Sequence, residues 1–236
     1  NLSIYDKILL INYKERIQMT NQEFIDSLSQ KAKKIITNYQ YKNINKTDII
    51  VYLNNTVNRV NMDHPNTYII EIKKQESLYD MEYAFLHEFC HCIQSDSGFP
   101  YINYINVNYR TLSECLSSIV LDCDVYNRLL EKGYKENPNI LHSEFNNIYD
   151  TLFVISREKK FGNYLNDIDH QIYYAGKLVI LSKFYDNDIN VKSITNLVKN
   201  KFPIIYKDYN IFINAIKRYG FTSPKSVRKI FKTIIR

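Results

Sequence analysis

The chain has 236 residues, of which 45% are hydrophobic and 24% are charged. These proportions are typical of a soluble globular protein, and no apolar run approaches the roughly 18 residues that a membrane-spanning helix needs. The composition therefore argues against a transmembrane protein, and a chain of this length does not need disulfides to stabilise its core.

Charge is distributed unevenly along the chain, although the net charge is only +6. Residues 190–236 contain 11 Lys and Arg against one acid, Asp208, which gives +10. The other residues contain 20 basic and 24 acidic groups, which gives −4. A basic C-terminal region of this kind favours an anionic partner, either a nucleic acid or a membrane surface.

The N-terminal half predicts a helix, two strands and a further helix. Thr20 to Glu23 has the form of a capping box, and apolar spacing continues the helix for about five turns to Tyr39. The runs Asp48–Leu53 and Thr67–Ile72 are predicted strands, and the polar stretch 54–65 between them is a predicted loop. A helix follows over Leu78–Gln94.

The remainder of the chain predicts helices alone. One long helix covers Thr111–Glu131, and Gly133 serves as its C-terminal cap. Further helices are predicted over Ile140–Ser156, Asp169–Tyr185, Val191–Lys199 and Asp208–Arg218, and the last one starts at Ser223-Pro224. Helices around a small antiparallel or mixed sheet predict an α+β, mostly helical fold. With few Gly and Pro and no repeats, residues 1–236 predict a single domain, with a core at about 48–131 and a basic helical region at about 190–236.

The strongest chemical signal is His87-Glu88-Phe89-Cys90-His91 in the middle of the predicted helix 78–94. Residues four apart on a helix share one face, so both imidazoles can bind one cation. Glu88 is close enough to reach a metal-bound water without being a ligand. A Lewis acid that lowers the pKa of water and a carboxylate that takes its proton are what hydrolysis requires. The alternative is a packed helix with two satisfied histidines.

A catalytic zinc takes three protein ligands and leaves one position for water. Glu114, early in the helix 111–131, is the best candidate for the third ligand, and Asp122 and Asp124 are alternatives. The small residues Ser117 and Ser118 would allow a close approach between this helix and the helix 78–94. A plain helix-N-terminal carboxylate, favoured by the helix dipole, is the competing interpretation of Glu114.

The four cysteines are predicted to be free thiols in a reducing compartment. Cys90 and Cys92 point about 160° apart on their helix, so they cannot join a tetrahedral site with both histidines. Cys115 and Cys123 also fall in a predicted helix. This pattern favours a cytoplasmic location, although a chain that starts with Asn leaves a removed upstream segment open.

The motif followed by a glutamate on a later helix resembles the gluzincin group of zinc metallopeptidases, over about residues 48–131. The spacing is also similar to compact zincin cores such as the ImmA/IrrE-type and minigluzincin enzymes. The resemblance implies that His87, His91 and Glu114 bind Zn²⁺ and that Glu88 is the general base. It also implies that the strand Thr67–Ile72 is an edge strand along which an extended peptide substrate is held.

Two positions differ from related patterns. Many gluzincins have an Asp four residues after the glutamate ligand, where this chain has Ser118, so Ser118, Asp122 or a backbone carbonyl must orient a histidine. Gln94 stands where the metzincin pattern requires Gly, which argues against a metzincin. His170, Tyr173 and Tyr174 are candidate oxyanion donors, with packing as their alternative role. His64 and His142 have no recognisable constellation around them.

The last predicted helix is basic and amphipathic. It could contact phosphates or an anionic membrane, or simply pack its apolar stripe and expose its charges. The basic residues are Lys225, Arg228, Lys229, Lys232 and Arg236, and the apolar ones are Val227, Ile230, Phe231, Ile234 and Ile235.

The sequence as a whole predicts a zinc metallopeptidase that acts on a peptide or protein substrate. The alternative is a regulatory or nucleic-acid-associated protein with the zincin fold and little general protease activity. The substrate, the cleavage specificity and the oligomeric state are left open.

Overall fold

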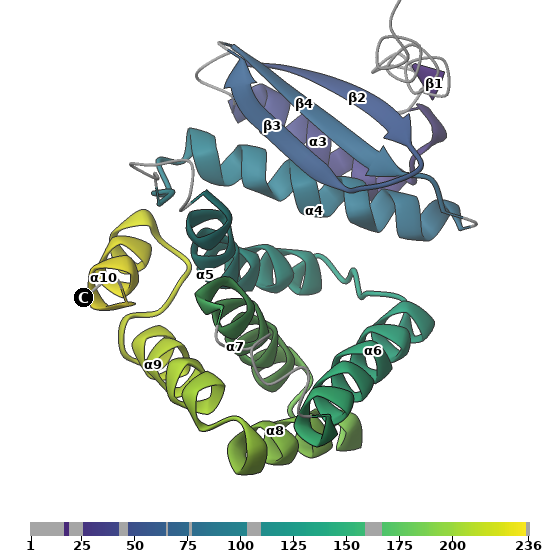
Figure 1. Cartoon of the computed structure of the whole chain (residues 1–236). Coiled ribbons are helices and arrows are strands. Elements are labelled where there is room, and N and C mark those ends of the chain that lie inside the picture. Colours follow the sequence, from purple (N-terminus) through teal and green to yellow (C-terminus); the bar gives the residue numbers. More distant parts are fainter. Residues whose placement is uncertain are drawn as a thin grey trace, which may run out of the picture. The chain divides into compact units, whose positions relative to one another are not determined.

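A computed structural model describes residues 17–18, 26–42, 47–64, 66–75, 77–102, 110–158 and 167–234 (Figure 1). The chain is α+β and mostly helical, as predicted, with a small mixed sheet and a helical C-terminal region. It divides into two compact units, residues 1–97 with 133–135, and residues 98–132 with 136–236. The single domain inferred from the sequence stays a prediction.

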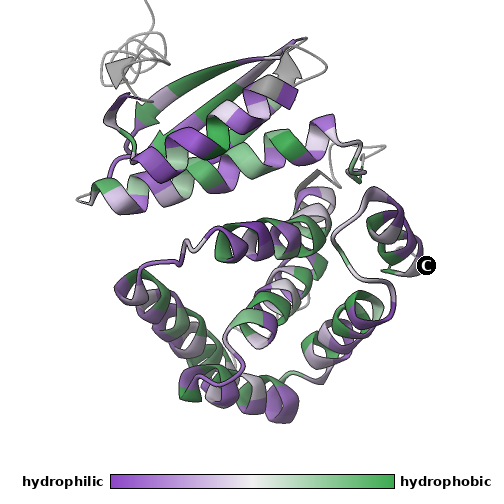
Figure 2. Cartoon of the chain, turned by 180° about the vertical axis from the view of Figure 1, so that it is seen from behind, coloured by the Kyte–Doolittle hydropathy of each residue, from purple (hydrophilic) through white to green (hydrophobic). Residues whose placement is uncertain are grey.

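The first unit contains a mixed sheet with strand order β1-β2-β4-β3. Its strands are β1 (Ile17–Gln18), β2 (Asp48–Asn54), β3 (Arg59–His64) and β4 (Thr67–Lys73). β2 and β4 are parallel, whereas β1–β2 and β3–β4 are antiparallel. The strands β2 and β4 bury one face of the sheet, and helices α3 (Gln30–Lys42) and α4 (Leu78–Asp96) lie over the sheet on one side (Figures 1 and 2). The buried strand residues are Ile49, Val51, Leu53, Tyr68, Ile70 and Ile72.

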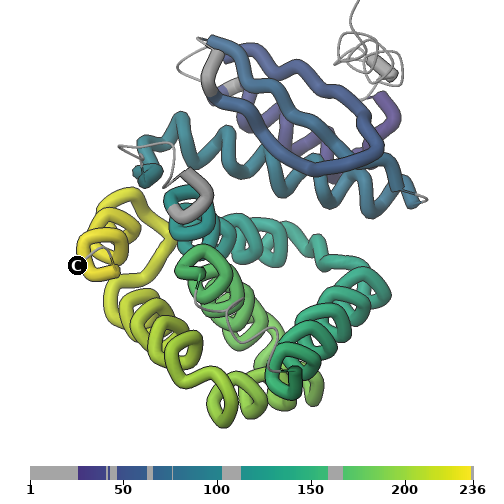
Figure 3. Tube along the Cα trace, viewed as in Figure 1, coloured from purple at the N-terminus to yellow at the C-terminus, as the bar shows by residue number. Residues whose placement is uncertain are grey.

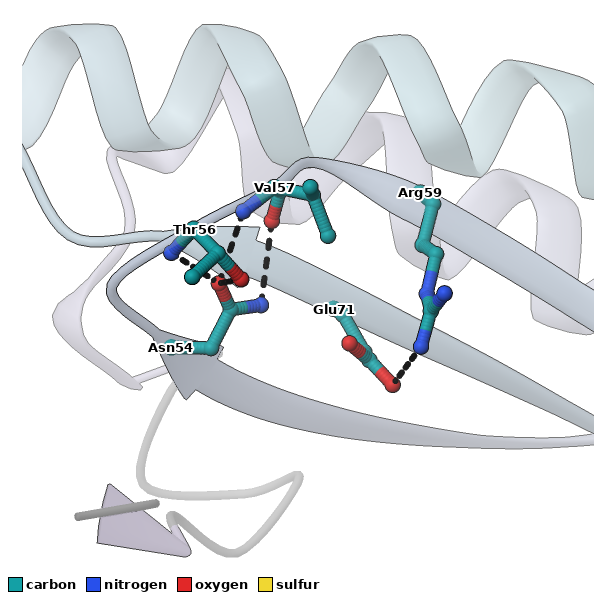
Figure 4. A network of polar contacts seen from close by, with 5 residues as sticks. All are labelled: Asn54, Thr56, Val57, Arg59 and Glu71. Carbon is teal, nitrogen blue, oxygen red and sulfur yellow. Dashed lines mark hydrogen bonds and ion pairs between the residues drawn. The ribbon is translucent and has the colours of Figure 1, made fainter. Parts of the chain in front are cut away.

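The strand β3 and its turn were missed in the sequence, which predicted a loop over 54–65. The buried side chain of Asn54 organises the turn: its Oδ1 accepts from the backbone N–H of Thr56 (2.7 Å) and Val57 (2.9 Å) (Figure 4). Across the β3–β4 pair, the guanidinium of Arg59 meets the carboxylate of Glu71 at 3.0 Å. The sequence of β3, Arg59–His64, lacks a regular alternation of apolar and polar residues, so no strand was predicted there. The strand forms because β4 supplies its hydrogen-bonding partners.

This sheet order overturns one prediction. β4, which covers the predicted edge strand Thr67–Ile72, is an interior strand because β2 pairs with one side of it and β3 with the other. Its backbone is therefore not available to add a substrate strand, and among the described strands β3 is the edge on that side.

The first helix also differs from its prediction. The capping box Thr20–Glu23 lies outside the described residues. The described chain departs from helical conformation at Leu28 and Ser29, so α3 begins at Gln30 rather than continuing from residue 20. The Ser29 hydroxyl accepts from the backbone N–H of Ala32 at 3.2 Å, as an N-terminal capping side chain does.

The second unit is built from helices, and the predicted ones are all present within a few residues of their expected bounds. They are α5 (Arg110–Glu131), α6 (Pro138–Arg157), α7 (Ile168–Phe184), α8 (Ile189–Lys201), α9 (Pro203–Tyr219) and α10 (Pro224–Ile234). α7 lies inside the unit with α5, α6, α8 and α9 around it, as the chain trace shows (Figure 3). Its buried residues lie on most of its faces, as expected of a central helix.

Gly176 on α7 allows this packing. A Cβ at this position would lie 2.2 Å from Cγ1 of Ile119 on α5, so only glycine permits the two helices to approach so closely. The helices of the described ranges include none whose length and apolar content would suit a membrane span.

Candidate metal centre

The motif helix α4 carries both histidines of the HExxH sequence on one face. Ser77 caps the helix, since its side chain accepts from the backbone N–H of Asp80. The imidazole rings of His87 and His91 have centroids 5.2 Å apart and planes at 73°. Both side chains are half-buried. One rigid helix therefore presents two imidazoles close enough together to bind the same ion.

The side chain of Gln94 contacts the imidazole ring of His91. Its Oε1 lies 2.9 Å from Nδ1 of His91, one helical turn earlier, and the Gln94 side chain is fully buried. An amide oxygen only accepts hydrogen bonds, so this contact is made by the neutral tautomer that has its proton on Nδ1 and its lone pair on Nε2. Histidine ligands of metal ions are typically oriented in this way by an acceptor on the other ring nitrogen. This arrangement fits a metal bound through Nε2 of His91.

Glu88 follows His87 on the same helix and is 8% exposed. Burial, followed by the charge of Glu88, raises the pKa of the Cys92 thiol, which donates to the backbone carbonyl of Glu88 at 3.6 Å. The four cysteines are free, as predicted, and Cys90, Cys92 and Cys123 are buried. A buried thiol with a raised pKa is a poor metal ligand, which agrees with leaving the cysteines out of the site.

Both ends of α4 are anchored within the first unit. At the C-terminal end, the carboxylate of Asp96 accepts hydrogen bonds from the hydroxyls of Tyr39 on α3 and Tyr68 on β4, the latter at 2.7 Å. Burial, and after it Asp96, raises the pKa of Tyr68 to about 12. At the N-terminal end, the buried carboxylate of Glu82 accepts from Ser29 and from the hydroxyl of Tyr134 at 2.8 Å. The motif residues are therefore held on a fixed support.

The candidates for the third ligand lie on α5, in the second unit. Glu114, Ser118 and Asp122 are spaced at four-residue intervals and line one cavity of that unit. Asp124 points elsewhere: its side chain is 2% exposed and accepts from Nε of Arg128 at 2.5 Å. Asp124 forms this buried ion pair, and Glu114 and Asp122 are the candidates that line the cavity. That either of them joins the histidines stays a prediction.

The serine next to this set has a different role. Ser117 is buried, and its hydroxyl accepts from the backbone N–H of Ile102 at 3.0 Å, which fixes the start of the second unit against α5. The expectation that Ser117 and Ser118 allow α5 to approach α4 stays a prediction.

The three candidate oxyanion donors lie in different surroundings. His170 lies in the first turn of α7, with Nδ1 at 3.8 Å from Oδ2 of Asp167. Tyr174 is buried in the core of the second unit, so its packing role is the one observed. Tyr173 is 44% exposed and lines the same cavity as Glu114. His142 is exposed on α6, and the side chain of His64 lies outside the described residues.

Gln94 is the residue that the sequence interpretation missed. In the sequence it served only to argue against a metzincin. Its position three residues after His91 on a helix was the available signal, because such side chains are neighbours on the helix surface.

Comparisons with known proteins assign the chain to no family. The chain matches no protein-family model, and neither a curated protein nor a solved structure shows significant similarity to it. The resemblance to gluzincins therefore rests on the sequence motif alone and stays a prediction.

Proposed function

We propose that the chain is a zinc-dependent metallopeptidase that hydrolyses peptide bonds. The observation that carries this proposal is the pair of histidines on α4, with Nδ1 of His91 bound to the buried Gln94 and Glu88 one residue after His87.

Each residue has a separate task in this proposal. Nε2 of His91 and a nitrogen of His87 would hold the ion, and Glu114 would complete the ligand set, with Asp122 as the alternative. Zinc, when bound, supplies a Lewis acid that polarises the peptide carbonyl and makes water a nucleophile near neutral pH. Glu88 takes the proton from that water and returns it to the leaving amine.

The test separates metal binding from catalysis. Elemental analysis of the wild type is expected to find one zinc per chain, and Glu88→Gln should keep the zinc while losing hydrolysis of a peptide library by at least about 100-fold. Glu131→Gln, an exposed carboxylate on α5, is the matched control and should leave activity unchanged. A zinc-free wild type after reconstitution, or a fully active Glu88→Gln, would contradict the proposal.

Substitutions on α5 identify the third ligand. Glu114→Ala and Asp122→Ala are compared for zinc content under the same conditions. The ligand is the residue whose loss weakens zinc binding, and the proposal expects this residue to be Glu114.

A second candidate function rests on the basic C-terminal region. Ten Lys and Arg of α8, α9 and α10 are exposed, and within the described residues none of them pairs with a carboxylate. The apolar stripe of α10, which includes Val227, Ile230 and Phe231, packs into the core, so the charges face solvent (Figure 2). The ten residues are Lys192, Lys199, Lys201, Lys207, Lys217, Arg218, Lys225, Arg228, Lys229 and Lys232.

In this alternative the protein binds nucleic-acid phosphates through these residues and has little general protease activity. Binding to a labelled duplex should then weaken steeply with salt and survive Glu88→Gln. Replacing both Lys225 and Lys229 with Glu, which reverses two charges, should weaken the binding of the duplex at any given salt concentration. Duplex binding that is absent at low salt would exclude this function.

A further inference from the structure

The last two helices of the second unit are joined by a short turn. α9 ends at Tyr219 and α10 begins at Pro224, so only residues 220–223 separate them (Figure 1). Gly220 opens the turn with φ 71°, and its backbone N–H donates to the carbonyl of Ile216 at 2.9 Å. A helix does not continue through this left-handed conformation, so α9 stops here. Two helices joined by a turn of about three or four residues that contains a glycine are typical of a helix-turn-helix.

Hydrogen bonds and burial fix the start of α10. The Ser223 hydroxyl accepts from the backbone N–H of Ser226 at 3.2 Å, and the Ser223 carbonyl accepts from that of Val227 at 3.0 Å. Phe221 of the turn is buried in the core of the second unit, and α10 packs against α9. α10 is therefore held firmly against α9 and is not a loose tail.

α10 has a basic side and an apolar side. At about 100° per residue, its four basic residues fall within an arc of about 100°, and all of them are exposed. Val227, Ile230 and Phe231 lie on the opposite side and are buried in the core. Residues 220–236 contain no acid, so nothing in this segment offsets the positive charge. The four basic residues are Lys225, Arg228, Lys229 and Lys232.

Two sets of contacts position the basic side. Nη2 of Arg228 donates to the carbonyl of Gly98 at 3.1 Å, which ties α10 to the first residue of the second unit. Arg218 at the end of α9 and Lys229 on α10 both lie over the ring of Tyr219, with their charged groups 5.2 and 5.9 Å from its centroid. An aromatic face attracts cations, so charges from both helices gather beside the turn.

The dimensions and charge of α10 suit the major groove of double-stranded DNA. Its 11 residues span about 16 Å at 1.5 Å per residue, and a helix about 10–12 Å across fits a groove about 12 Å wide. The major groove of duplex RNA is too deep and narrow for side chains to read. DNA phosphates attract a surface whose charges are all positive. These properties favour DNA over RNA as the partner.

The apolar side of α10 argues against a membrane as the partner. A helix that binds a membrane surface inserts its apolar side among the lipids. The apolar residues Val227, Ile230 and Phe231 are instead packed in the core of the second unit. Only the charged side of α10 is therefore open to a partner.

We propose that α9 and α10 form a DNA-binding helix-turn-helix, in which α10 lies in the major groove and α9 crosses the phosphate backbone. In such motifs, residues near the start of the second helix contact the base edges. The exposed residues there are Thr222, Lys225 and Lys229, and lysine typically donates to O6 and N7 of guanine. This assignment deepens the second candidate function, on which it rests for the phosphate contacts. It does not depend on the proposed peptidase activity.

The first test is selection from a pool of short, randomised DNA duplexes by the full chain. We expect one sequence to be enriched and to bind at least about tenfold more tightly than its shuffled version, measured by fluorescence anisotropy at the same salt concentration. The RNA duplex of the enriched sequence should bind no better than the shuffled DNA. A pool without enrichment, or equal affinities for the DNA and RNA duplexes, would overturn the proposal.

Variants separate base contacts from phosphate contacts. Lys225→Ala should reduce the preference for the enriched duplex over the shuffled one by at least about fivefold, because one base contact is lost. Lys192→Ala, at an exposed position on α8, should leave this preference unchanged, because a phosphate contact does not depend on sequence. Lys34→Ala, at an exposed position on α3 in the first unit, is the matched control and should change neither affinity. The same loss of preference in all three variants would contradict the role of α10.

This proposal and the second candidate function fail separately. Salt-sensitive binding to duplexes without any sequence preference would leave the phosphate-binding function standing and contradict the helix-turn-helix. Binding to vesicles of phosphatidylserine and phosphatidylcholine, with no binding to any duplex at low salt, would contradict both.

Discussion

Replacing Gln94 with Met tests whether His91 is prepared as a metal ligand. Gln94 is fully buried, and its Oε1 accepts from Nδ1 of His91 at 2.9 Å. Met has a similar length and shape, so the substitution removes the acceptor without opening a large cavity.

The size of the effect of Gln94→Met depends on which nitrogen of the His91 imidazole keeps the proton. If the proton stays on Nδ1, a partly buried N–H loses its partner, which costs up to about 1–3 kcal/mol of folding free energy. If the proton moves to Nε2, the nitrogen proposed to bind zinc loses its lone pair. In both cases zinc affinity should fall by about 10- to 100-fold, as is usual when such an orienting group is removed.

The assay is competition for zinc with a chromophoric chelator, combined with urea unfolding of the metal-free protein. Gln40→Met, an exposed position on α3, is the control and should change neither quantity. A Gln94→Met variant that is less stable but binds zinc with wild-type affinity would refute the reasoning, because Gln94 would then act only in packing.

Three further predictions concern stability. Gly176→Ala should destabilise the protein by about 1–3 kcal/mol in thermal unfolding, because the new Cβ would lie 2.2 Å from Cγ1 of Ile119; stabilisation, which helix propensity alone predicts, would contradict this packing. Glu82→Gln should cost about 1–3 kcal/mol in urea unfolding, since the carboxylate accepts from Ser29 and Tyr134, whereas the exposed Glu131→Gln should stay within about 0.5 kcal/mol. Burial first, and Glu82 in addition, raises the pKa of Tyr134 from 10.0 to about 12. The folded state therefore holds this proton more tightly than the unfolded state, and its stabilising contribution is present below pH 10 and lost between pH 10 and 12. Urea unfolding across this range should show a smaller loss in Tyr134→Phe, and an identical pH dependence would refute the assignment.

The helices and the motif could be predicted because they depend on neighbours in the sequence. Ser223 precedes Pro224 at the start of α10, where its hydroxyl accepts from the backbone N–H of Ser226 at 3.2 Å. His87 and His91 share a face of α4 because residues four apart do so on any α-helix. Such interactions span one turn of helix, so the sequence contains all of the information that they require.

Other features depend on residues distant in the chain, and only the tertiary structure decided them. β3 is a strand because β4 pairs with it, and that same pairing makes β4 an interior strand. Glycine is required at position 176 only because Ile119 of another helix lies against it. The cavity lined by Ser118, Glu144 and Lys177 likewise exists because α5, α6 and α7 meet. No local pattern reports these contacts, since their energy comes from burial and hydrogen bonds between segments that the sequence separates.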